Sequence, residues 1–305
     1  MQKRFPMKIC IFGNKTSTLE LLLHLTKNKI TIHSLVCVSE NVASKNTISG
    51  FESNLISVAK KLKINVFAVS DYSLSKSDQL KIFSESKFDL GLSTGWQRII
   101  PNNILKQFKY GIFGWHGSGF HLPNGRGRSP LNWSIRLGLQ HVYHNCFKYA
   151  SLADDGEIFD ISKIIIKKND YIYDVQIKAL KHIKKSALKL IRSLNNGYPI
   201  LLKQTMHPFI YFPKLDEESR HIQPELMKVE QAINIIRSCS APFPGAFLID
   251  QINQKKIRLW RATGQILKNQ KKYPGEKRIK KHIIEIHMID GLIRSTDFEI
   301  EGIKE

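Results

Sequence analysis

The N-terminal half of the 305-residue chain alternates short apolar runs with segments of helical spacing. Parallel strands joined by helices are buried on both faces, so they read as near-continuous apolar runs. The pattern therefore predicts an α/β fold with a doubly wound, mainly parallel, Rossmann-like sheet. The expected strands are residues 8–13, 31–39, 64–69, 88–93 and 109–116, and the expected helices between them are residues 17–28, 50–63 and 75–87.

The middle of the chain continues this domain, which we expect to span residues 1–200. Ser129 and Pro130 suit an N-cap and a first helical turn, so residues 129–138 are predicted to be helical. Two strand-like segments then flank an acidic turn. A long amphipathic helix is expected over residues 171–194, with its apolar stripe on the sheet. That stripe comprises Tyr173, Ile177, Leu180, Ile183, Ala187, Leu190, Ile191 and Leu194.

The last third of the chain has a different pattern. Residues 206–305 contain one helical segment among short strands and turns, which predicts a smaller, mainly β, OB-like C-terminal domain. The segment FIYFPKL at residues 209–215 is expected to supply its first strand.

Composition limits the compartment and the partners. The chain lacks an apolar run of the ~18 residues that a membrane span needs, and its N-terminus lacks a signal-peptide cleavage site, so we expect a cytoplasmic protein. The four cysteines lie far apart, which predicts buried, reduced thiols. The formal net charge of +21 favours anionic partners, although lysines spread along the chain also fit a merely solvated surface.

Ligand sites in parallel α/β sheets lie at the carboxyl ends of the strands. His116 stands at such an end, and imidazole suits acid–base catalysis near neutral pH. Asp154 or Asp155, in the acidic turn, could orient that imidazole. The alternative is a structural histidine and a solvated Asp-Asp-Gly turn.

The loop after His116 is rich in glycine and arginine. Arg126 and Arg128 can bind phosphate or carboxylate groups, and the loop runs into a predicted helix N-terminus, which favours anions. We interpret the loop as a ligand contact, and an exposed basic loop is the alternative. Gly13, at the end of the first strand, lacks the GxGxxG continuation of a dinucleotide-binding fingerprint.

The order of these features resembles the formyltetrahydrofolate-dependent formyltransferases, which include methionyl-tRNA formyltransferase and the sugar N-formyltransferases. The resemblance spans most of the chain. The motifs that carry it are LSTGWQRIIP (92–101), GWHGS (114–118) with RGRSPLNW (126–133), DDGEI (154–158), YFPK (211–214) and FPGAF (243–247).

The resemblance implies a transferase that moves the formyl group of 10-formyltetrahydrofolate to a primary amine without a metal ion. It makes His116 the catalytic histidine and Asp154 the catalytic aspartate. It also places the folate co-substrate on the loop after the fourth strand. The residues expected to bind it are Ser93, Thr94, Gly95, Trp96, Arg98, Ile99 and Ile100.

One position departs from the family pattern. The family has Asn-x-His, whereas Gly114 stands two residues before His116 here, so the amide that helps to hold the oxyanion is absent from its usual place. Ser118, Asn124 and Asn132 are nearby candidate donors. The departure also leaves open an inactive folate- or nucleotide-binding homologue.

The acceptor is expected to be a small, phosphorylated amine, above all a nucleotide-linked amino sugar. Methionyl-tRNA enzymes of the family carry a basic insertion after the second strand, whereas residues 39–53 here contain one lysine. The net charge and the C-terminal domain keep methionyl-tRNA as the alternative acceptor. The predicted substrate-binding residues are Ser118, Asn124, Arg126, Arg128 and Asn132.

Overall fold

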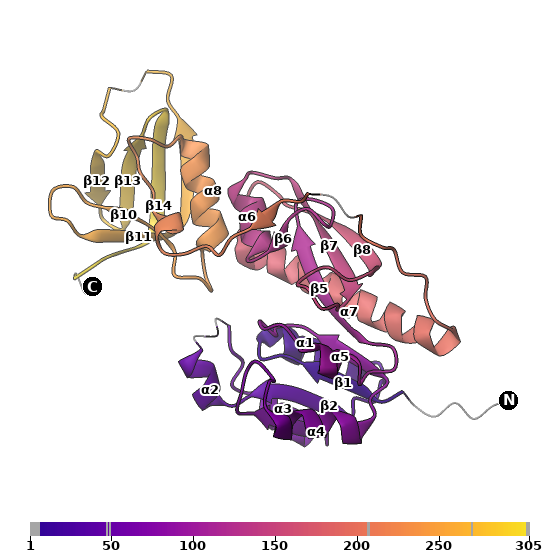
Figure 1. Cartoon of the computed structure of the whole chain (residues 1–305). Coiled ribbons are helices and arrows are strands. Elements are labelled where there is room, and N and C mark those ends of the chain that lie inside the picture. The colour runs from indigo at the N-terminus through magenta and orange to yellow at the C-terminus, as the bar shows by residue number, and fades with distance from the viewer. Residues whose placement is uncertain (1–6, 47, 49, 206–207, 270, 303–305) are drawn as a thin grey trace.

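The computed structural model describes residues 7–46, 48, 50–205, 208–269 and 271–302. It contains a seven-stranded sheet of order β3-β2-β1-β4-β5-β7-β8, a five-stranded sheet of order β10-β11-β14-β13-β12 and the two-stranded pair β6-β9 (Figure 1). The seven-stranded sheet is formed by β1 (Ile9–Phe12), β2 (Ser34–Val38), β3 (Asn65–Val69), β4 (Leu90–Ser93), β5 (Ile112–Ser118), β7 (His141–Lys148) and β8 (Ile158–Ile165).

Strand direction alternates only at one edge of the large sheet. The five strands from β3 to β5 are parallel, whereas β7 runs antiparallel to β5 and β8 runs antiparallel to β7. The predicted mainly parallel α/β sheet is therefore confirmed. The helices of this part are α1 (Thr16–Lys27), α2 (Glu40–Lys45), α3 (Leu55–Lys61), α4 (Ser77–Ser86), α5 (Asn102–Leu105), α6 (Pro130–Arg136) and α7 (Ile172–Asn196).

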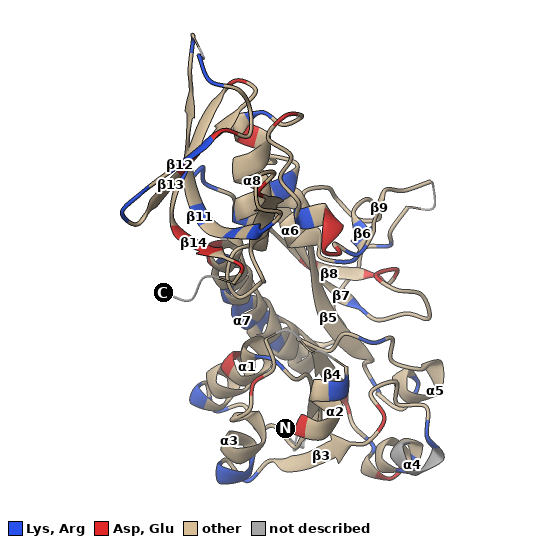
Figure 2. Ribbon diagram, turned by 90° about the vertical axis from the view of Figure 1, so that its left-hand side faces the viewer, with Lys and Arg blue, Asp and Glu red and all other residues tan. Residues whose placement is uncertain are grey.

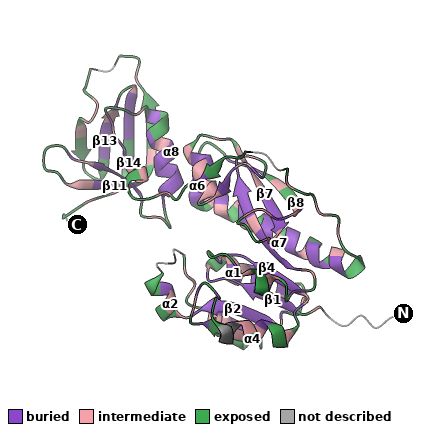
Figure 3. Ribbon diagram, in the orientation of Figure 1, coloured by how far each residue is buried: buried purple, intermediate pink, exposed green. Residues whose placement is uncertain are grey.

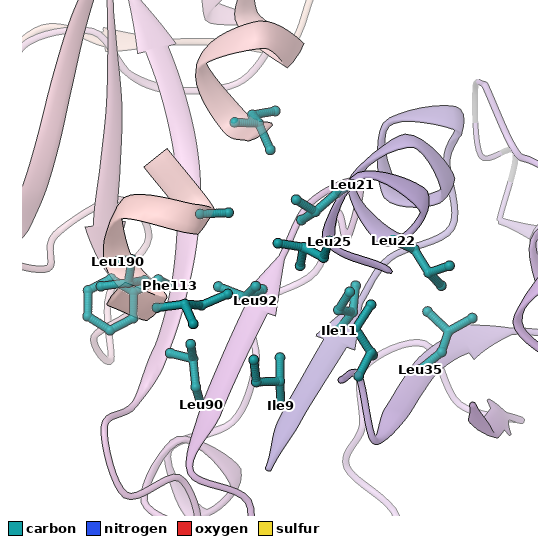
Figure 4. Packing of buried hydrophobic residues seen from close by; sticks show 14 of the residues in the cluster. Ile9, Ile11, Leu21, Leu22, Leu25, Leu35, Leu90, Leu92, Phe113 and Leu190 are labelled. Atoms are coloured by element: carbon teal, nitrogen blue, oxygen red, sulfur yellow. The ribbon is translucent and has the colours of Figure 1, made fainter. Parts of the chain in front are cut away.

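Alternate residues of the parallel strands point into two different cores. Ile9 and Ile11 pack with α1, α3 and α7 on one face, as Figure 4 shows for the α1 and strand side chains. Cys10 and Phe12 pack on the other face with residues of α4 and α5. Both faces are thus covered, which explains why these strands read as uninterrupted apolar runs. All four cysteines are buried and free, as expected.

Helix α7 has the expected length but presents a partly different face to the sheet. Tyr173 and Ile177, which we placed in the buried stripe, are exposed. The buried face instead includes the polar residues His182 and Ser186. Ser186 accepts a hydrogen bond from the indole N–H of Trp115 on β5 (2.8 Å). An apolar stripe alone could not identify a face that buries satisfied polar groups.

The C-terminal part packs one helix on an antiparallel sheet. It contains the 3₁₀ turn η1 (Glu218–Arg220), α8 (Val229–Cys239), β10 (Ala246–Ile249), β11 (Lys256–Ile266), β12 (Lys277–Lys280), β13 (Ile283–Met288) and β14 (Gly291–Ile300). Figure 3 shows buried positions where α8 meets this sheet and where it approaches α6. The proposed start of the C-terminal domain, residues 206–207, lies outside the described residues.

Polar contacts fasten α8 to the first part of the chain. The guanidinium of Arg237 donates to the backbone carbonyls of Asp170 (2.8 Å) and Lys167 (2.9 Å), just before α7. The amide of Asn132 on α6 donates to the carbonyl of Ser238 (2.7 Å). Ser129 precedes α6 but makes no side-chain capping bond, because its backbone is left-handed (φ 54°).

The segment expected to begin the C-terminal sheet lies elsewhere. Strand β9 (Tyr211–Phe212) pairs in parallel with β6 (Arg126–Gly127), in the loop that follows β5. The ring of Phe212 stacks on Trp133 of α6, with ring centroids 5.6 Å apart. This segment therefore supports the candidate site. Within the described ranges, no helix is long and apolar enough to cross a membrane.

Candidate active site

The strand order brings the predicted site residues together. Strand β4 lies beside β5, and Ser93 pairs with Gly114 in the register of the two strands. His116 follows two residues later and therefore lies on the same face of β5 as Gly114. The acidic turn, which joins β7 to β8, also reaches this edge, where Asp154 contacts His116.

Both ring nitrogens of His116 face hydrogen-bond acceptors. Its Nδ1 lies 3.4 Å from Oδ2 of Asp154, and its Nε2 donates to the carbonyl of Gly125 at 2.8 Å. The residue is only 7% exposed. A neutral imidazole can donate to one of these oxygens and a protonated one can donate to both. The contacts with Asp154 and Gly125 therefore fix the orientation of the imidazole ring.

The structure distinguishes the two candidate aspartates. Asp154 adopts a left-handed backbone conformation (φ 56°) that aims its carboxylate at His116, and the backbone N–H of Gly127 donates to it (3.2 Å). Asp155 forms an ion pair with Arg126 at 2.6 Å. Gly156 permits this tight turn, since a Cβ there would lie 1.5 Å from a backbone oxygen of β7. Asp154 is thus the partner of His116.

Arg126 holds the loop to its neighbours. Besides Asp155, its guanidinium bonds to Oε1 of Gln204 (2.6 Å) and lies over the ring of Phe209. Gln204 in turn donates to the carbonyl of Asp154 (2.9 Å). This buried arginine therefore fixes the acidic turn. Arg128 is exposed and enters no ion pair within the described part of the chain.

The remaining predicted substrate-binding residues are already engaged within the protein. The side-chain oxygen of Asn124 accepts the N–H of Ile210 (3.0 Å), and the fully buried Ser118 accepts the N–H of Phe120 (3.2 Å). Asn132 contacts α8, as described above. Of the five, Arg128 alone is exposed.

The loop after β4 combines a left-handed glycine with buried polar atoms. Gly95 has φ +79° and lies against Lys15. Thr94 accepts a bond from Thr18 on α1 (2.6 Å). The indole N–H of Trp96 is buried and has no partner among the described residues. These contacts hold the polar loop against the segment that follows β1.

The other predicted folate-binding residues divide between core and surface. Ile100 is buried with the α4 and α5 core, so its side chain supports the loop from below. Ile99 is 63% exposed. The guanidinium of Arg98 lies over the ring of Tyr72 at 5.1 Å and bonds to Asn46 (3.3 Å).

Three residues at this edge were not singled out from the sequence: Asn145, Tyr149 and Gln204. Asn145 lies opposite His116 on β7, is fully buried, and donates to the carbonyl of His116 (3.3 Å). Tyr149 donates to Ser93 (3.2 Å). The alternation of residues 145, 147 and 149 on one strand face was the available signal for the first two.

Positive charge is not confined to the site. Figure 2 shows Lys and Arg on helices and strands along the whole molecule, including α7 and the C-terminal sheet. The +21 net charge is therefore shared by many surfaces and does not by itself identify a nucleic-acid-binding face.

No protein-family model matches the chain. It is similar to the bifunctional polymyxin resistance protein ArnA of Wigglesworthia glossinidia brevipalpis, with 30% identity over 187 residues. That match covers 58% of this chain and 26% of ArnA, so the chain spans about a quarter of that relative's length.

Solved structures share the fold. HypX from Aquifex aeolicus, in complex with tetrahydrofolic acid, matches with a TM-score of 0.69 and 16% identity, over 96% of this chain and 44% of that one. An N-formyltransferase from Helicobacter canadensis, in complex with folinic acid and dTDP-3-aminofucose, matches with a TM-score of 0.64 and 16% identity. That match covers 96% of this chain and 100% of the other.

Proposed function

We propose that this chain is a divergent formyltransferase, which transfers the formyl group of 10-formyltetrahydrofolate to the primary amine of a nucleotide-linked amino sugar. The observation that carries the proposal is the contact between the buried His116 and the partly buried Asp154, 3.4 Å apart, at the carboxyl end of β5 and beside the loop that follows β4. A proton-accepting pair at this point of an α/β sheet suits acyl transfer to an amine.

The reaction is a substitution at the formyl carbon. The amine nitrogen of the acceptor bonds to that carbon, the bond to N10 of the folate breaks, and the products are the formamide and tetrahydrofolate. One proton leaves the acceptor nitrogen and one reaches N10. Nε2 of His116 would first release the carbonyl of Gly125 and then transfer this proton from the acceptor nitrogen to N10. Meanwhile, the carboxylate of Asp154 would stabilise the positive charge on the imidazole ring.

The residues present fit a folate co-substrate. The loop at residues 93–100 offers the buried indole N–H of Trp96, which has no hydrogen-bond partner in the described part of the chain and is a donor of the kind that a pterin can use. Arg98 and Lys15 supply positive charge near the same loop, and the glutamate tail of folate is an anion. These residues would bind and orient the co-substrate, and the proton transfer belongs to His116 and Asp154.

The acceptor proposal depends on charge and on the available contacts. Arg128 is the exposed arginine of the loop that adjoins His116, so it is suited to a phosphate of the acceptor, whereas Arg126 is committed to Asp155. The Helicobacter canadensis relative, whose full length matches this chain, is described with dTDP-3-aminofucose. The alternative acceptor, methionyl-tRNA, rests on net charge and on the presence of a C-terminal part.

The test is to incubate the full chain with 10-formyltetrahydrofolate and dTDP-3-aminofucose, and to follow tetrahydrofolate release together with the formylated sugar by mass spectrometry. Parallel reactions contain methionyl-tRNA or no acceptor. We expect turnover with the amino sugar and little with methionyl-tRNA. Turnover with methionyl-tRNA alone would overturn the acceptor assignment, and no transfer to any amine despite folate binding would overturn the enzymatic one.

A further inference from the structure

Gly114 opens a space that another side chain fills. A Cβ built on Gly114 would lie 2.2 Å from Cε1, 2.3 Å from Oη and 2.5 Å from Cζ of Tyr149. Real Cβ atoms do not approach other atoms so closely, so any larger residue at position 114 would displace the phenol. The glycine and the tyrosine therefore form a matched pair.

The backbone fixes the phenol on the face that carries His116. The N–H of Tyr149 donates to the carbonyl of Ile112 at 2.7 Å, which extends the β5–β7 pairing by one residue. Residues 112, 114 and 116 share one face of β5, and their partners on the antiparallel strand share it too. The ring packs against Phe147 on that face, with ring centroids 5.4 Å apart.

The hydroxyl is held beside the candidate reaction centre. It donates to Oγ of Ser93 at 3.2 Å, and Ser93 begins the proposed folate loop. Burial raises the pKa of Tyr149 to about 12, and the nearby carboxylate of Asp154 also raises it. The phenol therefore keeps its proton near neutral pH and remains a hydrogen-bond donor.

We propose that Tyr149 is a catalytic residue whose hydroxyl donates a hydrogen bond to the formyl oxygen as negative charge develops on it. This inference rests on the proposed formyl transfer. Ser93 would hold the hydroxyl in place before the substrate arrives, and the O–H would then turn from Ser93 to the formyl oxygen. The proton stays on the phenol throughout, so the step needs no further reactant.

The proposal also accounts for the glycine. A donor at the end of a rigid aromatic ring costs little side-chain entropy to hold, because only two torsions are fixed. It approaches from β7, across the strand, and so it needs an empty position at residue 114 of β5. His116 and Tyr149 then divide the chemistry, with proton transfer on the first and oxyanion stabilisation on the second.

The test is Tyr149→Phe in the full chain, assayed with 10-formyltetrahydrofolate and dTDP-3-aminofucose. We expect kcat to fall roughly 100- to 1,000-fold, as for other oxyanion-hole donors, with KM for both substrates nearly unchanged. The matched control is Tyr171→Phe, which removes a hydroxyl that bonds to the backbone of Ala262 in the C-terminal part. That control should keep the wild-type kcat.

A second variant, Gly114→Ala, keeps the hydroxyl but pushes the ring away, so its kcat should fall at least tenfold. Wild-type kcat in either Tyr149→Phe or Gly114→Ala would overturn the inference and leave the formyl transfer intact. A wild-type chain that transfers no formyl group would overturn both. If Tyr149→Phe fails to fold, as judged by circular dichroism, Gly114→Ala decides the matter.

Discussion

Replacing Asp154 with asparagine should isolate the electrostatic part of the proposed mechanism. Asparagine has the same shape, tolerates the left-handed backbone of this position (φ 56°), and can still accept the N–H of Gly127. Alanine would add backbone strain and so confuse the result. The substitution therefore removes one negative charge 3.4 Å from Nδ1 of His116 and little else.

The geometry sets the size of the effect. Two unit charges 3.4 Å apart interact by about 5 kcal/mol at an effective dielectric constant of ~20. The side chain of Asp154 is 20% exposed, so solvent screening reduces this value, and we take roughly 2 to 3 kcal/mol as the loss when His116 carries the second proton. The expected result is a fall of roughly 30- to 150-fold in kcat/KM.

The assay is formyl transfer to dTDP-3-aminofucose at saturating folate, with Asp155→Asn as the matched control. Asp155 lies in the same turn, but its carboxylate pairs with Arg126 and is 38% exposed. That variant should lose less than about threefold, because its amide oxygen can still accept a hydrogen bond from Arg126 and no charge beside His116 is removed. Equal losses in the two variants would mean that the turn acts only as a scaffold, and would refute the electrostatic role of Asp154.

Three further outcomes follow from the packing. Gly125→Ala should lower both stability and activity, because its φ is +78° and its Cβ would lie 1.8 Å from Oγ of Ser118; thermal unfolding and kcat measure this, and an unchanged melting temperature would count against it. Arg237→Ala should lower the free energy of unfolding by about 2 kcal/mol or more, measured in urea, because it leaves two backbone carbonyls without their donor. Burial lowers the pKa of His144 and of His182, so their contribution to stability is present above pH 6.5 and is lost as the pH falls; urea midpoints should drop as the pH is lowered below 6.5. His144→Asn should flatten that drop, and an unaltered slope would show that other groups cause it.

The sequence was sufficient for the parallel half of the fold because its signals are local. Each buried strand is a short apolar run, and each covering helix shows the helical spacing of apolar residues. The carboxyl ends of neighbouring parallel strands lie at the same edge of the sheet. His116 and the acidic turn could be predicted in this way, whereas the choice of Asp154 over Asp155 came from the family resemblance. The contact between His116 and Asp154 agrees with that choice. The exposed positions of Tyr173 and Ile177 show the limit of the method. Helix α7 buries a histidine and a serine that have polar partners across the sheet, and no local pattern contains those partners.

The same limit explains why Tyr149 was missed. Its place beside Gly114 depends on the register of β5 against β7, which joins residues 35 positions apart and shifts every side chain to the other face if it slips by one. Read alone, Gly114 is the loss of a functional amide. When the register is taken into account, Gly114 leaves the space that the phenol ring of Tyr149 occupies. The missing side chain at position 114 therefore allows a hydrogen-bond donor from position 149. Before a departure from a family pattern is taken as evidence of lost activity, the residues on the neighbouring strand should be examined for a replacement donor.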